Sequence, residues 1–197
     1  MLESLREGFD APLRSRLEPL VRWLAERQVT PNQVTLAALA LSVLAALCIG
    51  VGGLRLGALV LIVASLGDLV DGMLARATDQ ASPFGAFFDS TLDRISEGAV
   101  LAAVAYRLAG DGRPLLVALV VLALLGSLLV SYTRARAEAL GIDCKVGLMS
   151  RAERMVLLIA GLLLGLLGPA IVLMAALTLY TVGQRVQHVH EALGGGE

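Results

Sequence analysis

The sequence predicts an all-α integral membrane protein, with six transmembrane helices that follow an amphipathic helix in the membrane interface. Its 197 residues are 57% hydrophobic and only 17% charged, whereas soluble domains average about 45–50% apolar and about 25% charged residues. Apolar runs of about 20 residues, enough to cross a bilayer as a helix, recur along the chain. The net charge is −1, so no overall positive field attracts nucleic acid, and we expect no nucleic-acid partner.

The first 28 residues form the predicted interfacial helix. They lack the apolar stretch and cleavage site of a signal peptide, so we expect the first hydrophobic span to stay as an anchor. We expect one domain over residues 1–197, in which residues 33–190 form the six-helix bundle. Apolar and basic positions alternate as in helices that lie in the interface plane: Leu13, Leu17, Leu20, Val21 and Leu24 against Arg14, Arg16, Arg22 and Arg27.

Five runs with few or no charges account for the six spans. The last has 30 residues and as a single helix would measure about 45 Å, well beyond a hydrocarbon core of about 30 Å. Gly168-Pro169 interrupts it, which favours two short spans, the first beginning near Arg151, over one long tilted helix. The runs are Val34–Leu54, Leu56–Ala75, Gly85–Tyr106, Pro114–Thr133 and Met155–Gln184.

The basic residues predict the orientation. With six spans and a cytoplasmic N-terminus, only Arg55, Arg107 and Arg113 of the sixteen Lys and Arg residues fall on the outer side. This distribution matches the positive-inside rule. We therefore expect a multi-pass protein of the cell (inner) membrane.

Four aspartates lie within or at the end of apolar spans: Asp68, Asp71, Asp89 and Asp93. A lone aspartate at a span centre costs about 2.5–3.5 kcal/mol on insertion scales, so this group needs compensation. At 100° per residue, Asp68 and Asp71 share a face of the second span with Gly72 and Ala75. Gly85, Asp89 and Asp93 share a face of the third span, which Ser82-Pro83 is expected to begin as N-cap and first residue.

The short connection between these two spans makes them antiparallel neighbours, so their acidic faces can meet. Carboxylates suit hard cations such as Mg²⁺, Mn²⁺ or Ca²⁺. Two divalent ions would roughly neutralise the four aspartates and could clamp a diphosphate. The small residues on both faces leave room beside the ions, so the pattern predicts a site for a nucleotide diphosphate.

A divalent cation transporter could also contain four carboxylates in the membrane. Such a protein typically carries acids or broken helices near the bilayer midplane. The last three spans have no acid at that depth, which favours an enzyme.

The acidic residues belong to a longer string that resembles the signature of the CDP-alcohol phosphatidyltransferases. All eight fixed positions are present: Asp68-x2-Asp71-Gly72-x2-Ala75-Arg76-x8-Gly85-x3-Asp89-x3-Asp93. The resemblance implies a six-helix, homodimeric enzyme with its site open to the cytoplasm. It implies two divalent metal ions, Mg²⁺ or Mn²⁺, on the four aspartates, with Asp93 also the general base.

The resemblance also implies a CDP-linked lipid, CDP-diacylglycerol, as the phosphatidyl donor and CMP as the leaving product. Arg76 is then expected to neutralise nucleotide phosphates, and Gly72, Ala75 and Gly85 to make room for the nucleotide. Thr30-Pro31-Asn32-x2-Thr35 resembles a family feature near the nucleotide, which adds Asn32 and Thr35. An ordinary helix start explains these two residues equally well.

Basic residues on the cytoplasmic side predict an anionic acceptor. Arginine favours bidentate phosphate binding, although the positive-inside rule alone explains part of the group. Ser131 to Glu138 and Arg151 to Arg154 are similar to the prokaryotic phosphatidylinositol phosphate synthases, which implies inositol 1-phosphate as the acceptor. Glycerol 3-phosphate is the alternative. The expected phosphate ligands are Arg134, Arg136, Arg151, Arg154 and Arg185, together with Ser131. Glu97 is expected to pair with Arg94 at i, i+3.

Overall fold

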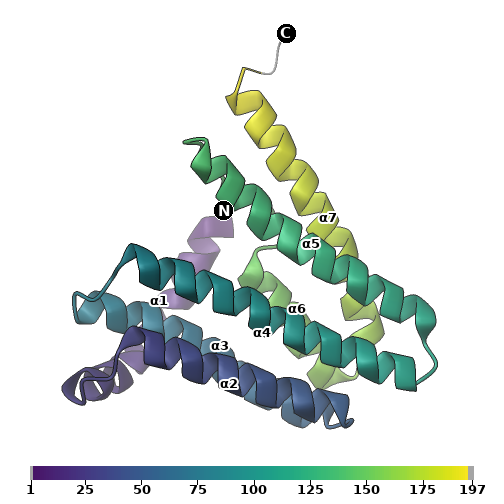
Figure 1. Cartoon of the computed structure of the whole chain (residues 1–197), viewed down its shortest axis with the longest axis horizontal. Helices are drawn as coiled ribbons and strands as arrows, with labels where there is room; N and C mark the ends of the chain where they lie inside the picture. The colour runs from purple at the N-terminus through teal and green to yellow at the C-terminus, as the bar shows by residue number, and fades with distance from the viewer. Residues whose placement is uncertain (1, 195–197) are drawn as a thin grey trace. The chain divides into compact units, whose positions relative to one another are not determined.

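The computed structural model describes residues 2–194, with side chains from residue 12 onward, and this part of the chain is entirely helical and irregular, without strands. The all-α prediction is therefore confirmed. In chain order (Figure 1) the helices are α1 (Leu2–Glu26), α2 (Pro31–Gly50), α3 (Leu54–Ala77), α4 (Pro83–Gly110), α5 (Pro114–Ala139), α6 (Arg151–Leu164) and α7 (Leu167–Ala192).

The described residues form two compact units. The first contains the chain up to Leu41 together with Val63–Ile95, and the second contains Ser42–Ile62 and the chain from Ser96 onward. The first unit has a small core in which Val21 of α1 packs with Val70 and Leu74 of α3. The second has a larger core that includes Ile49, Leu101, Leu158, Ile171 and Met174.

Local sequence fixes where α2 and α4 begin. Thr30 and Gln33 form a capping box: the Gln33 side chain accepts from the Thr30 amide at 2.9 Å, and the Gln33 amide donates to the Thr30 hydroxyl at 3.4 Å. At α4 the Ser82 hydroxyl accepts from the Gly85 amide at 3.0 Å. Pro83 is the first residue of α4, so the predicted start at Ser82-Pro83 is confirmed.

The last apolar run forms two helices, as predicted, but the break lies three residues before the expected one. α6 ends at Leu164, and Gly165 adopts a left-handed conformation with φ of 73°, which glycine tolerates at low cost. Gly168-Pro169 instead lies in the first turn of α7. Proline is accommodated there because the first turn's amides have no partner within the helix.

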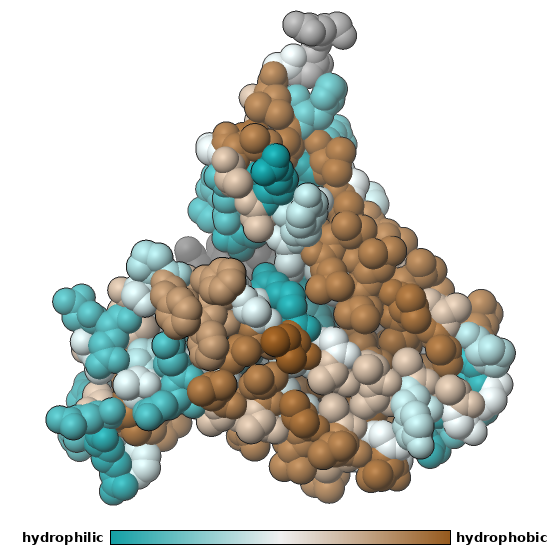
Figure 2. Space-filling model, viewed as in Figure 1, coloured by the Kyte–Doolittle hydropathy of each residue, from teal (hydrophilic) through white to brown (hydrophobic). Residues whose placement is uncertain are grey.

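Over residues 2–194, four helices are long and apolar enough to cross a membrane: α2, α3, α5 and α7. α4 has sufficient length but carries four charged residues within a stretch of nine: Asp89, Asp93, Arg94 and Glu97. α6 has 14 residues and spans about 21 Å, less than the hydrocarbon core. Apolar side chains also cover much of the visible surface (Figure 2), with Leu115 74% exposed, as expected for contact with lipid.

The predicted N-terminal helix is present as α1, but its apolar face is divided. Leu17, Val21 and Leu24 pack within the first unit. Leu20 and Trp23 are exposed, and the Arg27 guanidinium lies 4.0 Å from the centre of the Trp23 ring. Part of the face that was expected to meet lipid therefore holds α1 against α3.

Candidate functional site

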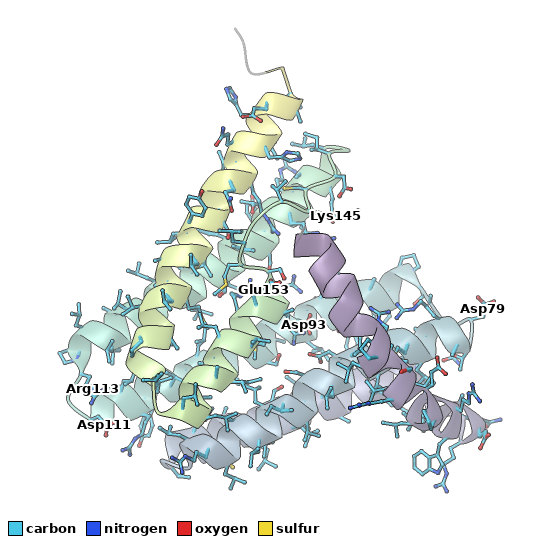
Figure 3. All side chains as sticks on the ribbon, turned by 180° about the vertical axis from the view of Figure 1, so that it is seen from behind. Asp79, Asp93, Asp111, Arg113, Lys145 and Glu153 are labelled. Atoms are coloured by element: carbon cyan, nitrogen blue, oxygen red, sulfur yellow. The ribbon has the colours of Figure 1, made fainter. Side chains whose placement is uncertain are left out.

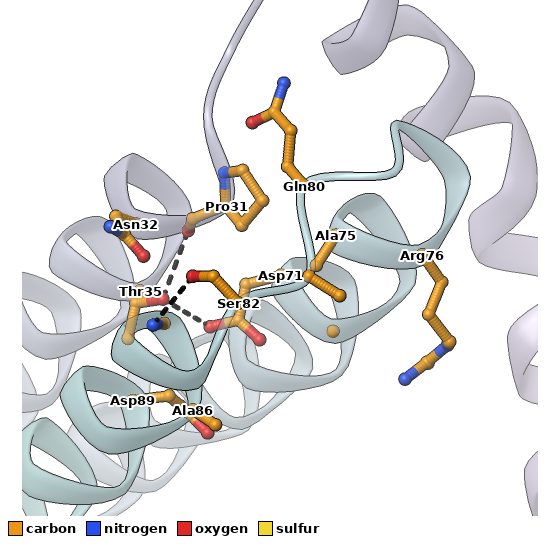
Figure 4. Close-up of a pocket in the computed structure, with 13 residues that line it drawn as sticks. Pro31, Asn32, Thr35, Asp71, Ala75, Arg76, Gln80, Ser82, Ala86 and Asp89 are labelled. Atoms are coloured by element: carbon orange, nitrogen blue, oxygen red, sulfur yellow. Dashed lines mark hydrogen bonds between the residues drawn. The ribbon is translucent and has the colours of Figure 1, made fainter.

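A cavity of about 230 Å³ lies in the first unit, where α2 and α4 begin and α3 ends. Figure 4 shows its lining. The lining includes six predicted residues besides two of the aspartates. They are Asn32, Thr35, Gly72, Ala75, Arg76 and Gly85, together with Asp71 and Asp89. The structure thus brings together every residue predicted to bind the CDP-lipid.

Asp71 is the most enclosed of the four aspartates, with 5% of its surface exposed. The Thr35 hydroxyl donates to its Oδ2 at 2.7 Å and also lies 3.1 Å from the Pro31 carbonyl oxygen, as Figure 4 shows. Thr35 itself is buried. This hydrogen bond connects the first turns of α2 to the acidic face of α3 and fixes the orientation of the Asp71 carboxylate.

The other aspartates lie in the same region of the first unit. The negative charges of Asp89 and Asp68 both act on Asp71, as the predicted meeting of two acidic faces requires. Asp68, Asp89 and Asp93 are half-buried. The Asp93 carboxylate lies 3.8 Å from the Arg94 guanidinium, a partly exposed contact of small energetic weight.

The donor set suits divalent cations. Carboxylate oxygens are the ligands that Mg²⁺ and Mn²⁺ prefer, and the repulsion of Asp71 by Asp68 and Asp89 would be offset by bound positive charge. Within residues 12–194, no three His, Cys, Asp or Glu side chains already stand together as a ready set of ligands for one ion. The aspartates thus fit the ions in the chemistry of their donor atoms.

Two glycines keep the cavity open beside the aspartates. A Cβ on Gly85 would lie 3.2 Å from the Ser82 hydroxyl and 3.7 Å from the Asn32 side-chain oxygen. A Cβ on Gly72 would lie 3.6 Å from a guanidinium nitrogen of Arg76. The Arg76 side chain is exposed and makes no hydrogen bond or ion pair with the side chains from residue 12 onward. It is thus available to an anion in the cavity.

The lining also contains residues that the sequence did not single out: Gln80, Ala81 and Ala86. They belong to the α3–α4 connection or to the first turn of α4. Their only signal was proximity to the signature residues, and nothing in their types distinguishes them from an ordinary turn.

The predicted acceptor residues lie in the second unit, where α5 separates two of them. Arg134 shares a face of α5 with Ser131 and pairs with Glu138 at 2.8 Å. Arg136 points about 200° away. It lines a separate groove between α5 and α7 with a second predicted arginine, Arg185, and with Tyr132, Leu140, Val186 and Val189. Residues at i and i+2 do not face one side of a helix, so Arg134 and Arg136 leave α5 on different sides.

Arg154 is enclosed rather than open to a ligand. It is 1% exposed, and its Nε and Nη2 donate to the two carboxylate oxygens of Glu97 at 2.6 and 2.8 Å. Its Nη1 donates to the Met149 carbonyl oxygen at 3.2 Å. Glu97, which was expected to pair with Arg94, thus has both oxygens occupied by Arg154. A lone glutamate in an apolar stretch signals the need for a partner, but the sequence does not identify a partner 57 residues away.

Arg185 is also buried and bonded to backbone. Its Nε donates to the Val146 carbonyl oxygen at 3.0 Å, and its Nη1 donates to the Val130 carbonyl oxygen. Arg151, by contrast, is half-buried at the first position of α6. Lys145 lies in the preceding loop (Figure 3), where its hydrogen bond lowers the pKa of Asp143. Of the five predicted arginines, the structure thus brings Arg136 and Arg185 together in the lining of one groove. It encloses Arg154 with Glu97 and pairs Arg134 with Glu138.

Comparison with known proteins identifies the family. Residues 28–183 match CDP-alcohol phosphatidyltransferase. The chain is 37% identical to an archaetidylinositol phosphate synthase of Methanothermobacter thermautotrophicus, over 97% of both chains. It is 36% identical to a phosphatidylinositol phosphate synthase of Corynebacterium glutamicum, over 89% of this chain and 84% of that one.

Solved structures agree with this assignment. The phosphatidylinositol phosphate synthase of Mycobacterium tuberculosis with CDP-DAG bound superimposes with a TM-score of 0.82 at 33% identity, covering 87% of this chain and 92% of the other. The same enzyme in complex with manganese and citrate gives a TM-score of 0.81 at the same identity. The chain therefore belongs to the CDP-alcohol phosphatidyltransferase family and is a membrane enzyme that transfers a phosphatidyl-type group.

Proposed function

We propose that the enzyme transfers the phosphatidyl group of CDP-diacylglycerol to inositol 1-phosphate and releases CMP. The observation that carries this proposal is the likeness, at 36–37% identity over most of the chain, to synthases named for inositol phosphate products. The relatives include both archaetidyl and phosphatidyl enzymes, so an ether-linked CDP-lipid is the natural second donor to test.

The cavity of the first unit is proposed to hold the CDP end of the lipid. Asp68, Asp71, Asp89 and Asp93 would hold two divalent ions, which offset the charge of the diphosphate and of the leaving CMP. Arg76 adds a charge-assisted contact to a nucleotide phosphate. The open faces at Gly72, Ala75 and Gly85 accept the nucleotide, and Asn32 lies beside Gly85 with a side chain able to hydrogen-bond it.

In the proposed reaction Asp93 takes the proton from the acceptor hydroxyl. The hydroxyl oxygen then forms a bond to the lipid-bearing phosphorus, and the bond from that phosphorus to CMP breaks. Asp93 has to be ionised to accept the proton. We further propose six spans, a cytoplasmic site in the inner membrane and a homodimer, in line with the basic residues at the cytoplasmic helix ends and with the family resemblance.

Thr35 provides a test of the cavity. Thr35→Val removes the hydrogen bond to Asp71 while keeping the shape, and the loss of a bond to a charged group costs about 1.5–3 kcal/mol. We expect kcat/KM for CDP-diacylglycerol to fall about 10- to 150-fold. Thr35→Ser should retain most of the activity because it keeps the hydroxyl. Equal losses in both variants would show that the Thr35 methyl group, rather than its hydroxyl, matters.

The acceptor is tested with purified protein, CDP-diacylglycerol and a panel of labelled alcohols, followed by CMP release. Inositol 1-phosphate should react, whereas free inositol and serine should not. Arg151→Ala should raise the acceptor KM about 10- to 150-fold if a charge-assisted bond to phosphate is lost, with a smaller change for CDP-diacylglycerol. Exclusive use of glycerol 3-phosphate would identify a phosphatidylglycerol phosphate synthase and contradict our choice of acceptor.

A further inference from the structure

The loop between α5 and α6 is held in place by side chains rather than by its own secondary structure. Three residues on successive turns of α7 bond to its backbone. The Thr181 hydroxyl accepts from the Met149 amide at 3.1 Å, Arg185 donates to the Val146 carbonyl, and the His188 ring lies 3.0 Å from the Asp143 carbonyl oxygen. Backbone groups without a helix or strand need such partners, so residues 143–149 run along one face of α7.

The end of this loop has a second attachment, through Arg154. The Arg154 guanidinium donates to the Met149 carbonyl oxygen while both carboxylate oxygens of Glu97 hold it from α4. Glu97 is 5% exposed and Arg154 is 1% exposed. A buried guanidinium that makes two parallel bonds to one carboxylate has one low-energy orientation, set by those bonds. Glu97 therefore determines where Arg154, and with it Met149, is placed.

Close packing leaves this loop little freedom. A Cβ on Gly147, whose φ is +123°, would lie 2.4 Å from the Thr181 methyl carbon. Cys144 is fully buried within the same loop. Ser150 and Arg151 follow directly, as the N-cap and first residue of α6, so the attachment at Met149 also fixes the direction in which α6 begins.

We infer that Glu97 is a positioning residue for acceptor recognition. It holds Arg154 in the orientation that supports the α5–α6 loop, and the supported loop in turn presents Arg151 to the acceptor's phosphate. This assignment rests on the proposed function and refines it, because Arg154 acts on the acceptor through Met149 and the start of α6, not as a phosphate ligand. Arg185, bonded to the Val130 and Val146 carbonyls, has the same supporting part on the other side of the loop.

Substitutions of Glu97 and Arg154 distinguish a supporting role of Arg154 in the loop from direct binding of the acceptor's phosphate by Arg154. Glu97→Gln removes the charge that holds Arg154. If Arg154 supports the loop, this substitution should raise the acceptor KM at least about ten-fold, as for the loss of one charge-assisted bond. The KM for CDP-diacylglycerol should change much less. If Arg154 binds the phosphate itself, Glu97→Gln frees the guanidinium, and the acceptor KM stays level or falls. That outcome overturns the inference.

A double substitution sharpens the comparison. Breaking a buried pair leaves an unpaired charge, whereas apolar side chains of similar volume often replace both partners without loss. Glu97→Met/Arg154→Met should therefore have a lower acceptor KM than Arg154→Met alone. Equal KM values for the double and single variants would mean that the guanidinium itself binds the phosphate. Asp111→Asn, which breaks an exposed pair with Arg107 in α4, is the matched control and should leave both KM values unchanged.

A readout independent of turnover keeps the inference distinct from the proposed function. In protein whose Cys48 is replaced by alanine, maleimide labelling of buried Cys144 reports release of the loop. Glu97→Gln should raise the labelling rate several-fold over wild type, and Asp111→Asn should not. An unchanged labelling rate of Cys144 in Glu97→Gln would contradict the supporting role of Glu97 and Arg154. If labelling were faster in Glu97→Gln but the enzyme used no phosphorylated alcohol, the supporting role of the pair would still hold. The proposed acceptor would then be refuted.

Discussion

Chelation of divalent metal is expected to abolish transfer, with no CMP release above background in excess EDTA. The negative charges of Asp68 and Asp89 both act on Asp71, and a diphosphate would bring further negative charge to the cavity that Asp71 and Asp89 line. Among the side chains from residue 12 onward, Arg76 is the one basic residue in the lining of that cavity, and a single guanidinium cannot offset this charge. Addition of Mg²⁺ or Mn²⁺ should restore activity.

The loss has to be separated from unfolding. The melting temperature of the protein in EDTA should remain well above the assay temperature, because the two hydrophobic cores are built from apolar side chains. Full turnover by a preparation that elemental analysis shows to be metal-free would refute the role proposed for the four aspartates.

The acidic site could be predicted from the sequence because its residues are close in the chain. Asp68 and Asp71 follow helical spacing on one helix, Asp89 and Asp93 on the next, and a short connection brings the two helices together. Thr35 was predicted only through the resemblance. Its bond to Asp71 joins positions 36 residues apart, and helical periodicity holds no information on such a contact.

The basic residues could not be assigned in the same way, because one residue type serves several purposes there. Arg151, Arg154 and Arg185 look alike in the sequence, yet Arg154 is enclosed by Glu97 and Arg185 by backbone carbonyls. These differences arise from tertiary packing. The sequence predicted the break before α7 three residues too late, because proline can begin a helix as readily as end one. Nothing in the sequence distinguishes the left-handed Gly165 from the other glycines of this run.

Asp93→Asn should lower kcat by two to four orders of magnitude, the usual contribution of a general base, about 10²- to 10⁴-fold. Asparagine keeps the size of the side chain and one oxygen donor but cannot accept the proton from the acceptor hydroxyl. Binding of the CDP-lipid should change less, since three other aspartates and Arg76 remain. The measurement is single-turnover CMP release with both substrates saturating, alongside the dissociation constant for CDP-diacylglycerol.

Asp79→Asn provides the matched control for the same chemical change. Asp79 lies in the turn between α3 and α4 (Figure 3), exposed and outside the cavity lining, with φ of 54°. Asparagine tolerates this left-handed conformation as well as aspartate does, so fold and turnover should be preserved. If Asp93→Asn turned over as fast as Asp79→Asn, the proton would have to pass to another group. Asp89, on the same helix face one turn earlier, would then be the first residue to substitute.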